Sequence, residues 1–175
     1  MKKLALLMGA LLFSGNLYAL DTVFVEYGNG DAADMARVGA GWDWNKQWFA
    51  DGNWLVTGSW EASVGTWRGN SVVGNQTITD IGVTPVFRLQ QKHPSGIAPY
   101  LEGAIGFHLI SPTFIYANRQ FGSSFQFGDH LGVGMRFGER QQFDLAYRYQ
   151  HLSNGGIKQP NQGINFSQIR FAYHF

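Results

Sequence analysis

A histidine and a serine lie two positions apart near the C-terminal end of the chain, as His151 and Ser153. In a β-strand, alternate side chains share a face, and their Cα atoms are roughly 6.6 Å apart. An imidazole can then reach a hydroxyl, which is the first requirement for an activated serine nucleophile. The shared face is otherwise apolar, because Phe143, Tyr147 and Tyr149 precede the pair on it. The two polar residues therefore continue an apolar stripe where folding alone would favour another hydrophobic residue.

The pair also has a purely structural interpretation, in which a strand becomes polar as it enters a loop and the His-x-Ser spacing is chance. The residues that follow favour chemistry instead. Asn154 offers an amide side chain, and Gly155 and Gly156 offer flexible backbone N–H groups. Groups of this kind stabilise the oxyanion that forms during acyl transfer. We therefore expect an oxyanion hole in this run, directly after Ser153.

A third residue can be placed beside the histidine from the geometry of the next hairpin. If residues 153–163 form a hairpin that is symmetric about Lys158, residue 165 pairs across from His151 and shares its outward face. That position is occupied by Asn165, and it is where a group would orient the imidazole. We expect no acidic residue on this outward face near the site.

The first 19 residues have the organisation of a secretory signal peptide. A charged start is followed by an apolar run over residues 4–13, and the small residue Ala19 ends the leader. The apolar run is too short to cross a bilayer as a helix. We therefore expect residues 1–19 to be a cleaved signal peptide and residues 20–175 to form one domain.

The composition excludes several classes of protein. Without the two lysines of the leader, the basic residues are one fewer than the 12 acidic residues, so no nucleic-acid footprint is visible. The chain has no cysteine, which excludes disulfides and thiolate metal sites. The histidines other than His151 share no spacing that is typical of a metal site.

The same composition is typical of a transmembrane barrel. Aromatic residues make up 15% of the chain and glycine 23 of its 175 residues, yet the mean hydropathy is only −0.16. Barrels combine these properties because lipid-facing and lumen-facing residues alternate along each strand. Residues 168–175 are apolar at odd positions, mostly polar at even positions, and end on Phe175. This segment resembles the terminal strand of bacterial outer-membrane barrels.

Seven further segments alternate in the same way, which makes the even number of strands expected of such a barrel. The sheet must close, because an open edge would leave backbone groups unpaired in lipid. We therefore predict an all-β fold, an eight-stranded antiparallel transmembrane β-barrel in the outer membrane of a Gram-negative bacterium. The predicted strands lie around residues 22–27, 37–44, 56–64, 77–90, 97–109, 121–137, 141–152 and 168–175.

The inward positions of these strands carry both signs of charge. An eight-stranded barrel is just wide enough to be filled by side chains, so we expect a plug of ion pairs and no pore. Pro85 falls within a predicted strand and cannot donate a ladder hydrogen bond, so we expect a bulge or bend there. The inward charged residues are Arg37, Glu61, Asp80, Arg88, Glu102, Arg136, Asp144, Arg148 and Arg170.

The topology places the candidate site in the membrane. With both termini in the periplasm, the connection 153–163 lies outside the cell. His151 and Ser153 then lie at the extracellular end of their strand and face the outer leaflet, which is made of lipopolysaccharide. Polar side chains are costly on the lipid side of a barrel wall and tend to be functional. This position favours chemistry on a lipid.

The run from His151 to Ile164, HLSNGGIKQPNQGI, resembles the active-site signature of the PagL family of outer-membrane lipid A 3-O-deacylases. The leader, the chain length and the strand pattern fit that family from end to end. The resemblance implies a serine esterase that removes the acyl chain ester-linked at the 3-position of lipid A, the membrane-anchored part of lipopolysaccharide. It implies His151 as the general base and Ser153 as the nucleophile, with no metal or organic cofactor. It also implies an oxyanion hole made of Asn154 and the backbone N–H of Gly156.

The third catalytic residue departs from the family, which has a glutamate where this chain has Asn165. An amide can orient the imidazole but carries no charge, and replacing Asp by Asn in a serine protease lowers turnover about 10⁴-fold. We therefore expect Asn165→Glu to raise turnover. Two alternatives stay open: a catalytically weakened PagL relative, and a non-enzymatic barrel of the OmpX kind that adheres or stabilises the membrane. The sequence also leaves a homodimer open.

Overall fold

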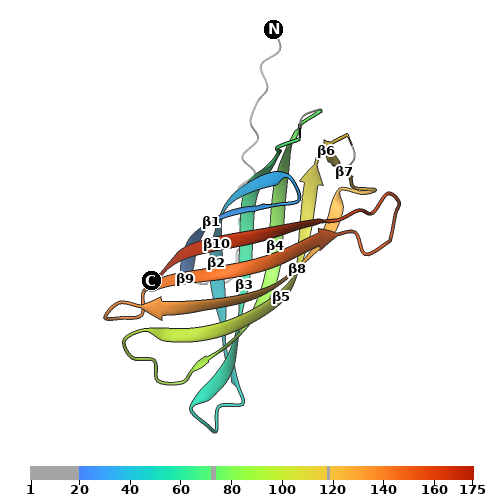
Figure 1. The fold of residues 1–175 in the computed structure, drawn as a ribbon. Coiled ribbons are helices and arrows are strands. Elements are labelled where there is room, and N and C mark those ends of the chain that lie inside the picture. The colour runs from blue at the N-terminus through green and yellow to red at the C-terminus, as the bar shows by residue number, and fades with distance from the viewer. Residues whose placement is uncertain (1–19, 72–73, 118) are drawn as a thin grey trace, which may run out of the picture.

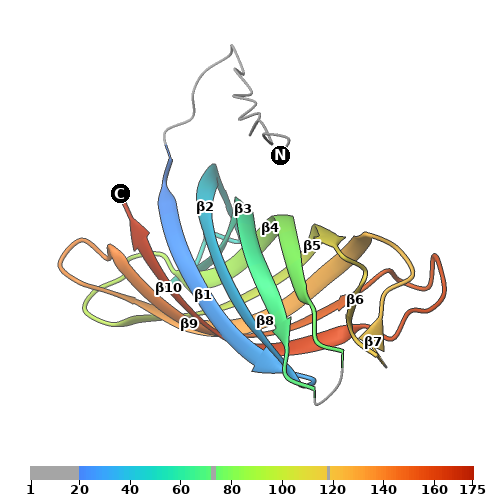
Figure 2. The same ribbon diagram turned by 90° about the horizontal axis from the view of Figure 1, so that it is seen from above.

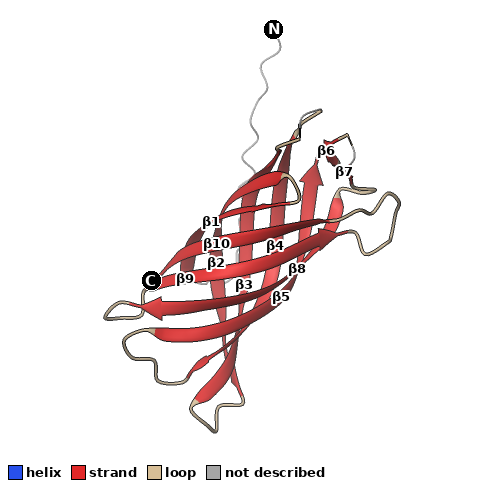
Figure 3. Cartoon of the chain, in the orientation of Figure 1, coloured by secondary structure: helices blue, strands red, loops and turns tan. Residues whose placement is uncertain are grey.

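The computed structural model describes residues 20–71, 74–117 and 119–175, and the predicted signal peptide lies outside these ranges. The described chain is built of strands, and eight of them close into an antiparallel barrel (Figures 1 and 3). Within this part of the chain, no helix is long and apolar enough to cross a membrane. The barrel strands are β1 (Thr22–Gly30), β2 (Ala33–Trp48), β3 (Trp54–Gly69), β4 (Thr77–Gln91), β5 (Ala98–Ser111), β8 (Phe125–Phe137), β9 (Phe143–Ser153) and β10 (Ile164–His174).

The strands neighbour one another in the order β1-β10-β9-β8-β5-β4-β3-β2, so the pairing of β1 with β10 and with β2 leaves no open edge in the barrel. Side chains alternate between the lumen and the outer wall. On β9, Leu145 and Tyr147 are exposed on the wall, whereas Asp144 and Arg148 are buried inside. Closure gives each barrel strand two hydrogen-bonded neighbours, which a lipid environment requires. The predicted all-β, eight-stranded barrel is confirmed.

The pairing around Pro85 differs from the prediction. Val83 pairs with Phe107 and Val86 pairs with Ala104, so the register between β4 and β5 is the same on both sides of the proline. The pairing is interrupted at the proline without an extra residue in either strand. Proline has no N–H to donate to the ladder, which accounts for the interruption. Of the predicted bulge or bend, the bulge is therefore absent, and the ladder to β5 is interrupted at Thr84 and Pro85 instead.

A network of ion pairs fills much of the lumen. Arg148 lies at its centre and donates to Glu26, Glu61 and Glu102. These side chains are almost fully buried, so each charge depends on its partners to offset the loss of hydration. The predicted plug of ion pairs is confirmed, except at Arg136, which is half-buried, donates to the carbonyl of Gln141 and has no ion pair among the described residues. Further pairs join Arg37 to Glu26 and Asp80, Arg88 to Glu102 and Asp144, and Arg170 to Glu61.

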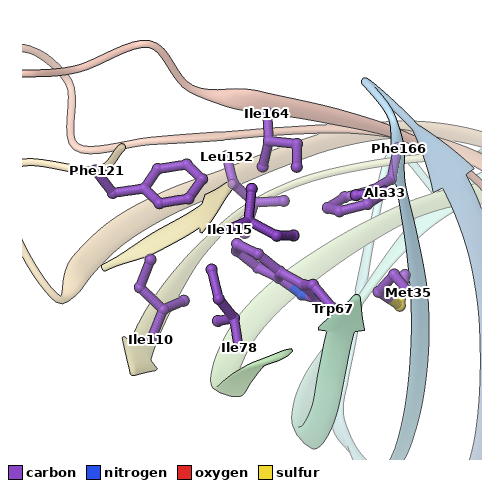
Figure 4. Packing of buried hydrophobic residues seen from close by; sticks show 10 residues of the cluster. All are labelled: Ala33, Met35, Trp67, Ile78, Ile110, Ile115, Phe121, Leu152, Ile164 and Phe166. Carbon is purple, nitrogen blue, oxygen red and sulfur yellow. The ribbon is translucent and has the colours of Figure 1, made fainter. Parts of the chain in front are cut away.

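At the end of the barrel away from the C-terminus, the lumen is apolar, which the sequence did not predict. Trp67 is fully buried there, and its ring packs against those of Phe121 and Phe166 (Figure 4). The alternation assigns Phe121 to the outer wall of a strand, and this assignment is wrong. The residue precedes β8, forms an isolated bridge with Asn161 and points into the cluster. The other members of the cluster are Ala33, Met35, Ile78, Ile110, Ile115, Leu152 and Ile164.

A small hairpin covers this apolar end. It consists of β6 (Phe114–Tyr116) and β7 (Arg119–Gln120), both in the connection between β5 and β8. Ile115 on β6 is fully buried in the apolar cluster. The N–H of Gln120 donates to the side chain of Gln162, so the hairpin lies beside the connection between β9 and β10 (Figure 2). The hairpin therefore links the lumen to the segment that follows Ser153.

Candidate active site

Strand β9 carries His151 and Ser153 to the rim of the barrel wall. Both side chains are half-buried and lie on the outward face, in line with the exposed Tyr149. The Oγ of Ser153 accepts the N–H of Gly155 at the long distance of 3.5 Å. The hydrogen bonds of the described residues include none between Ser153 and His151, and catalytic groups often tighten only when substrate binds. The two residues thus share the face and the position that the sequence predicts.

The partner of the histidine lies where the hairpin register predicts it. On β10, Asn165 pairs directly across from His151. The Nδ1 of His151 and the Oδ1 of Asn165 are 2.8 Å apart, so the imidazole donates from Nδ1 to the amide oxygen. In this tautomer, Nε2 carries no proton and is free to accept one.

Beyond Asn165 lies a carboxylate that the sequence analysis missed. Asp31 is in the turn between β1 and β2, and its Oδ2 lies 2.8 Å from the backbone nitrogen of Asn165 and 3.0 Å from its Nδ2. The two residues are 134 positions apart, so no local spacing reveals the contact. Closure of the barrel, which sets β1 beside β10, is the feature of the sequence that could have suggested it.

A second carboxylate contradicts the prediction that no acidic residue lies on the outward face near the site. Asp129 on β8 is exposed and pairs directly across from His151, on the side opposite to Asn165. Its odd position between Phe127 and Leu131 puts it on the outer wall by simple alternation. The pattern of the sequence therefore contained this residue, and the prediction overlooked it.

The charges near the site come from three elements. Besides the two carboxylates, Arg119 on β7 lies with its Nη1 3.7 Å from the Oδ2 of Asp31, and it donates to the carbonyl of Gly163 at 2.6 Å. In the described ranges, no three His, Cys, Asp or Glu side chains come together as ligands for a metal ion. The side chains present can abstract a proton, attack an electrophile and orient the base.

The turn after β9 is held by Asn154, which is fully buried. Its Nδ2 donates to the carbonyl of Lys158 at 2.7 Å, and its Oδ1 accepts the N–H of Gly156 at 3.0 Å. Gly155 and Gly156 have φ values of +65° and +81°, a conformation that glycine adopts without strain. The two donors expected in the oxyanion hole are thus engaged within the turn, and Gly155 presents its N–H to Ser153.

An apolar groove begins at His151 and crosses the outer wall over β8, β5 and β4. Its volume is about 540 Å³. Gly103 on β5 opens the groove, because it pairs with Phe87 on one side and Leu131 on the other and has no side chain to fill the space between them. Tyr149 lines the end of the groove next to the histidine. The groove has the shape and the lining to hold a hydrocarbon chain next to the candidate base.

Comparisons with known proteins point to one family. A family model described as "Lipid A 3-O-deacylase (PagL)" matches residues 34–174. The lipid A deacylase PagL of Pseudomonas aeruginosa is 33% identical over 135 residues, which are 77% of this chain and 75% of that protein. The lipid A deacylase PagL of Bordetella bronchiseptica is 34% identical over 128 residues, which are 73% of this chain and 57% of that protein.

Solved structures give the same result. The crystal structure of the outer membrane enzyme PagL superposes with a TM-score of 0.77 and 28% identity, over 88% of this chain and 99% of that one. Neisserial surface protein A superposes with a TM-score of 0.50 and 12% identity, over 88% of this chain and 94% of that one, and shares the fold alone. The described barrel is an outer-membrane barrel, and the end that carries the connection between β9 and β10 is the one that the sequence predicts to be extracellular. The chain belongs to the PagL family of lipid A 3-O-deacylases.

Proposed function

We propose that this chain hydrolyses the ester that links an acyl chain to the 3-position of lipid A in the outer leaflet, with Ser153 as nucleophile and His151 as base. One observation carries the proposal. His151 and Ser153 share the outward face at the extracellular end of β9, and the bond from Nδ1 to Asn165 leaves Nε2 of the imidazole free for the serine proton.

The reaction follows the chemistry of serine esterases. Ser153 Oγ attacks the carbonyl carbon while its proton passes to Nε2 of His151. The imidazolium then returns this proton to the sugar oxygen, the ester bond breaks, and the acyl group stays on the serine. His151 next takes a proton from water, whose oxygen attacks the acyl-enzyme, and the fatty acid leaves as the proton returns to Ser153. Asn165 holds the ring in one orientation through both steps.

We place the oxyanion at the turn of residues 154–156. The N–H of Gly155 already points to Ser153. Asn154 Nδ2 can join it only after it releases the Lys158 carbonyl, and the N–H of Gly156 only after it releases Asn154 Oδ1, so the turn must open slightly when substrate binds. Two or three donors at this point would stabilise the tetrahedral intermediate.

The acyl chain lies in the groove that crosses β8, β5 and β4, with its ester end at His151.

A homodimer is compatible with this function only if it leaves that wall open to lipid. We propose that any pairing uses the wall of β1, β2 and β3. The chain has no cysteine, so Val64→Cys on β3 should form a disulfide dimer in membranes, whereas Leu131→Cys in the groove should not.

The proposed function predicts that Ser153→Ala and His151→Ala each abolish deacylation without affecting the barrel. Mass spectrometry of lipid A from cells that express each variant measures the loss of the 3-position acyl chain, and heat-modifiable gel mobility checks folding. Ser167→Ala is a matched control, since Ser167 also faces outward and its hydroxyl accepts from the Tyr147 hydroxyl at 3.0 Å and not from a group of the site. Wild-type deacylation by Ser153→Ala would disprove the serine mechanism.

A further inference from the structure

We propose that Asp31 is the positioning residue that makes Asn165 an effective partner of His151. It determines which end of the amide faces the imidazole, and it supplies the negative charge that the amide lacks. This inference rests on the proposed function and deepens it. The carboxylate of the catalytic site does not contact His151 directly; it lies behind Asn165, on the turn between β1 and β2.

The orientation of the amide follows from the chemistry of a carboxylate. An ionised carboxylate only accepts hydrogen bonds, so the atom of Asn165 that lies 3.0 Å from Asp31 Oδ2 must be the NH₂ group. The carbonyl of the amide then faces His151, 2.8 Å from Nδ1. An amide oxygen cannot donate, so Nδ1 must carry the proton and Nε2 must be free. Asp31 therefore selects the tautomer that can activate Ser153.

Without Asp31, either end of the amide could face the imidazole. An NH₂ group beside Nδ1 would stabilise the tautomer protonated on Nε2, which cannot take the serine proton. This wrong tautomer explains the loss of about 10⁴ in turnover when asparagine replaces the aspartate of a serine protease. In this chain the hydrogen bonds from Asn165 to Asp31 prevent it.

The charge of Asp31 acts in the same direction. When His151 becomes an imidazolium, a carboxylate behind the amide polarises the amide and strengthens the bond from Nδ1. Arg119 forms a long ion pair with this carboxylate, at 3.7 Å, and gives its hydrogen bond to the Gly163 carbonyl, so it offsets the charge of Asp31 only in part. The other titratable groups that face the imidazole are Asp129 on β8 and Tyr149 on its own strand.

The surroundings hold Asp31 in place. Its φ is +46°, a left-handed conformation in which aspartate and asparagine are more common than other side chains. Its carbonyl accepts the hydroxyl of Tyr116 at 2.8 Å, and that hydroxyl also accepts from Arg119 Nε at 3.1 Å. The β6–β7 hairpin therefore fixes the turn that presents the carboxylate to Asn165. We expect such a set of fixed contacts around a residue whose role is to position another side chain.

The first test is Asp31→Asn, which keeps the size and the backbone preference but removes the charge. We expect kcat to fall about tenfold or more, the size of one lost charge-assisted hydrogen bond. The acid limb of the pH–rate profile should move to lower pH, because the protonated imidazole loses support. Asp34→Asn is the matched control: it removes a carboxylate from the next strand that accepts from Asn70 at 2.6 Å, and it should leave the profile unchanged.

The second test exchanges the two groups. Asn165→Asp alone sets two carboxylates at hydrogen-bond distance and should impair the enzyme, since like charges cannot both be accommodated there. For the same reason, the expectation from the sequence that Asn165→Glu raises turnover does not hold beside Asp31. Combined with Asp31→Asn, it puts the carboxylate directly on His151 with an amide behind it. We expect the double variant to regain most of the wild-type rate, with its acid limb at or above the wild-type pH. A purely structural role for Asp31 predicts instead that the two defects add.

The outcomes separate this inference from the proposed function. If the wild-type protein releases no fatty acid from purified lipid A in detergent, or Ser153→Ala releases as much, the proposed function fails. If the wild type is active but Asp31→Asn keeps its rate and profile, or the double variant is no better than both single variants, the role of Asp31 is wrong. Gel mobility checks the folding of each variant, and if Asp31→Asn alone does not fold, the comparison of Asn165→Asp with the double variant decides.

Discussion

Asn154 has two roles that the geometry allows, and they can be separated. Its hydrogen bonds with Asn161, Lys158 and Gly156 brace the turn after the nucleophile, whereas catalysis would require its Nδ2 to turn toward the oxyanion. We expect Asn154→Ala to lower turnover by roughly 10²–10³, the usual loss of one oxyanion donor. Asn154→Asp keeps the acceptor for Gly156 but has no donor, so it should be no more active than Asn154→Ala. Initial rates in detergent measure both, and activity regained by the aspartate would show that Asn154 only shapes the turn.

At the residue scale, sequence reasoning was sufficient where a contact follows from strand alternation or hairpin register. His151, Ser153 and Asn165 are related by these local rules, and the structure places them as predicted. Asp129 follows from the same rules and was overlooked. Asp31 does not follow from them, because it reaches Asn165 from a turn whose position depends on how the β6–β7 hairpin packs. Such a contact depends on the whole extracellular end and has no local signature.

At the scale of elements, the outer wall of β5 decides how the acyl chain is held. Gly103→Leu should fill the groove: a Cβ there lies 3.3 Å from the tip of Leu131, which can move, and 3.8 Å from the His130 carbonyl, an ordinary contact. We expect kcat/KM to fall about fourfold for each methylene of the acyl chain that no longer fits, with short chains spared. A series of lipid A esters with increasing chain length measures this, and Val64→Phe on β3 adds bulk outside the groove as a control. An equal loss for all chain lengths would place the acyl chain elsewhere.

The eight strands were predictable because a closed sheet in lipid imposes one apolar and one polar face on every segment. The β6–β7 hairpin was not, since its strands are short and its apolar residues point into the barrel mouth instead of to lipid. Phe121 shows the reason: its apolar side chain matches the lipid-facing alternation but is buried against Trp67. An apolar residue of such a barrel can face the lipid or be buried in the lumen, and alternation distinguishes these two positions only inside a strand.

At the scale of the whole molecule, the lumen has two parts with different physical origins. The ion-pair network joins the barrel strands through almost fully buried charges, and the apolar cluster fills the lumen at the end beneath the site. Charge alternation predicted the first part. The sequence did not predict the apolar cluster, in which Trp67, Ile115 and Phe166 are buried next to the turns that carry the catalytic groups. The catalytic groups are therefore supported from inside the barrel by a tightly packed apolar cluster.

The ion-pair network predicts an asymmetric response to the loss of a single charge. Arg148→Met leaves Glu26, Glu61 and Glu102 without their shared cation, so the free energy of unfolding should fall by about 3–5 kcal/mol, as when one partner of a buried pair is removed. Urea unfolding in lipid vesicles, followed by tryptophan fluorescence, measures the loss. Arg68→Met removes the same charge from an exposed position and should change the free energy of unfolding by less than about 0.5 kcal/mol. Equal stability of the two variants would mean that the buried carboxylates take up protons or water and that the network does not stabilise the barrel.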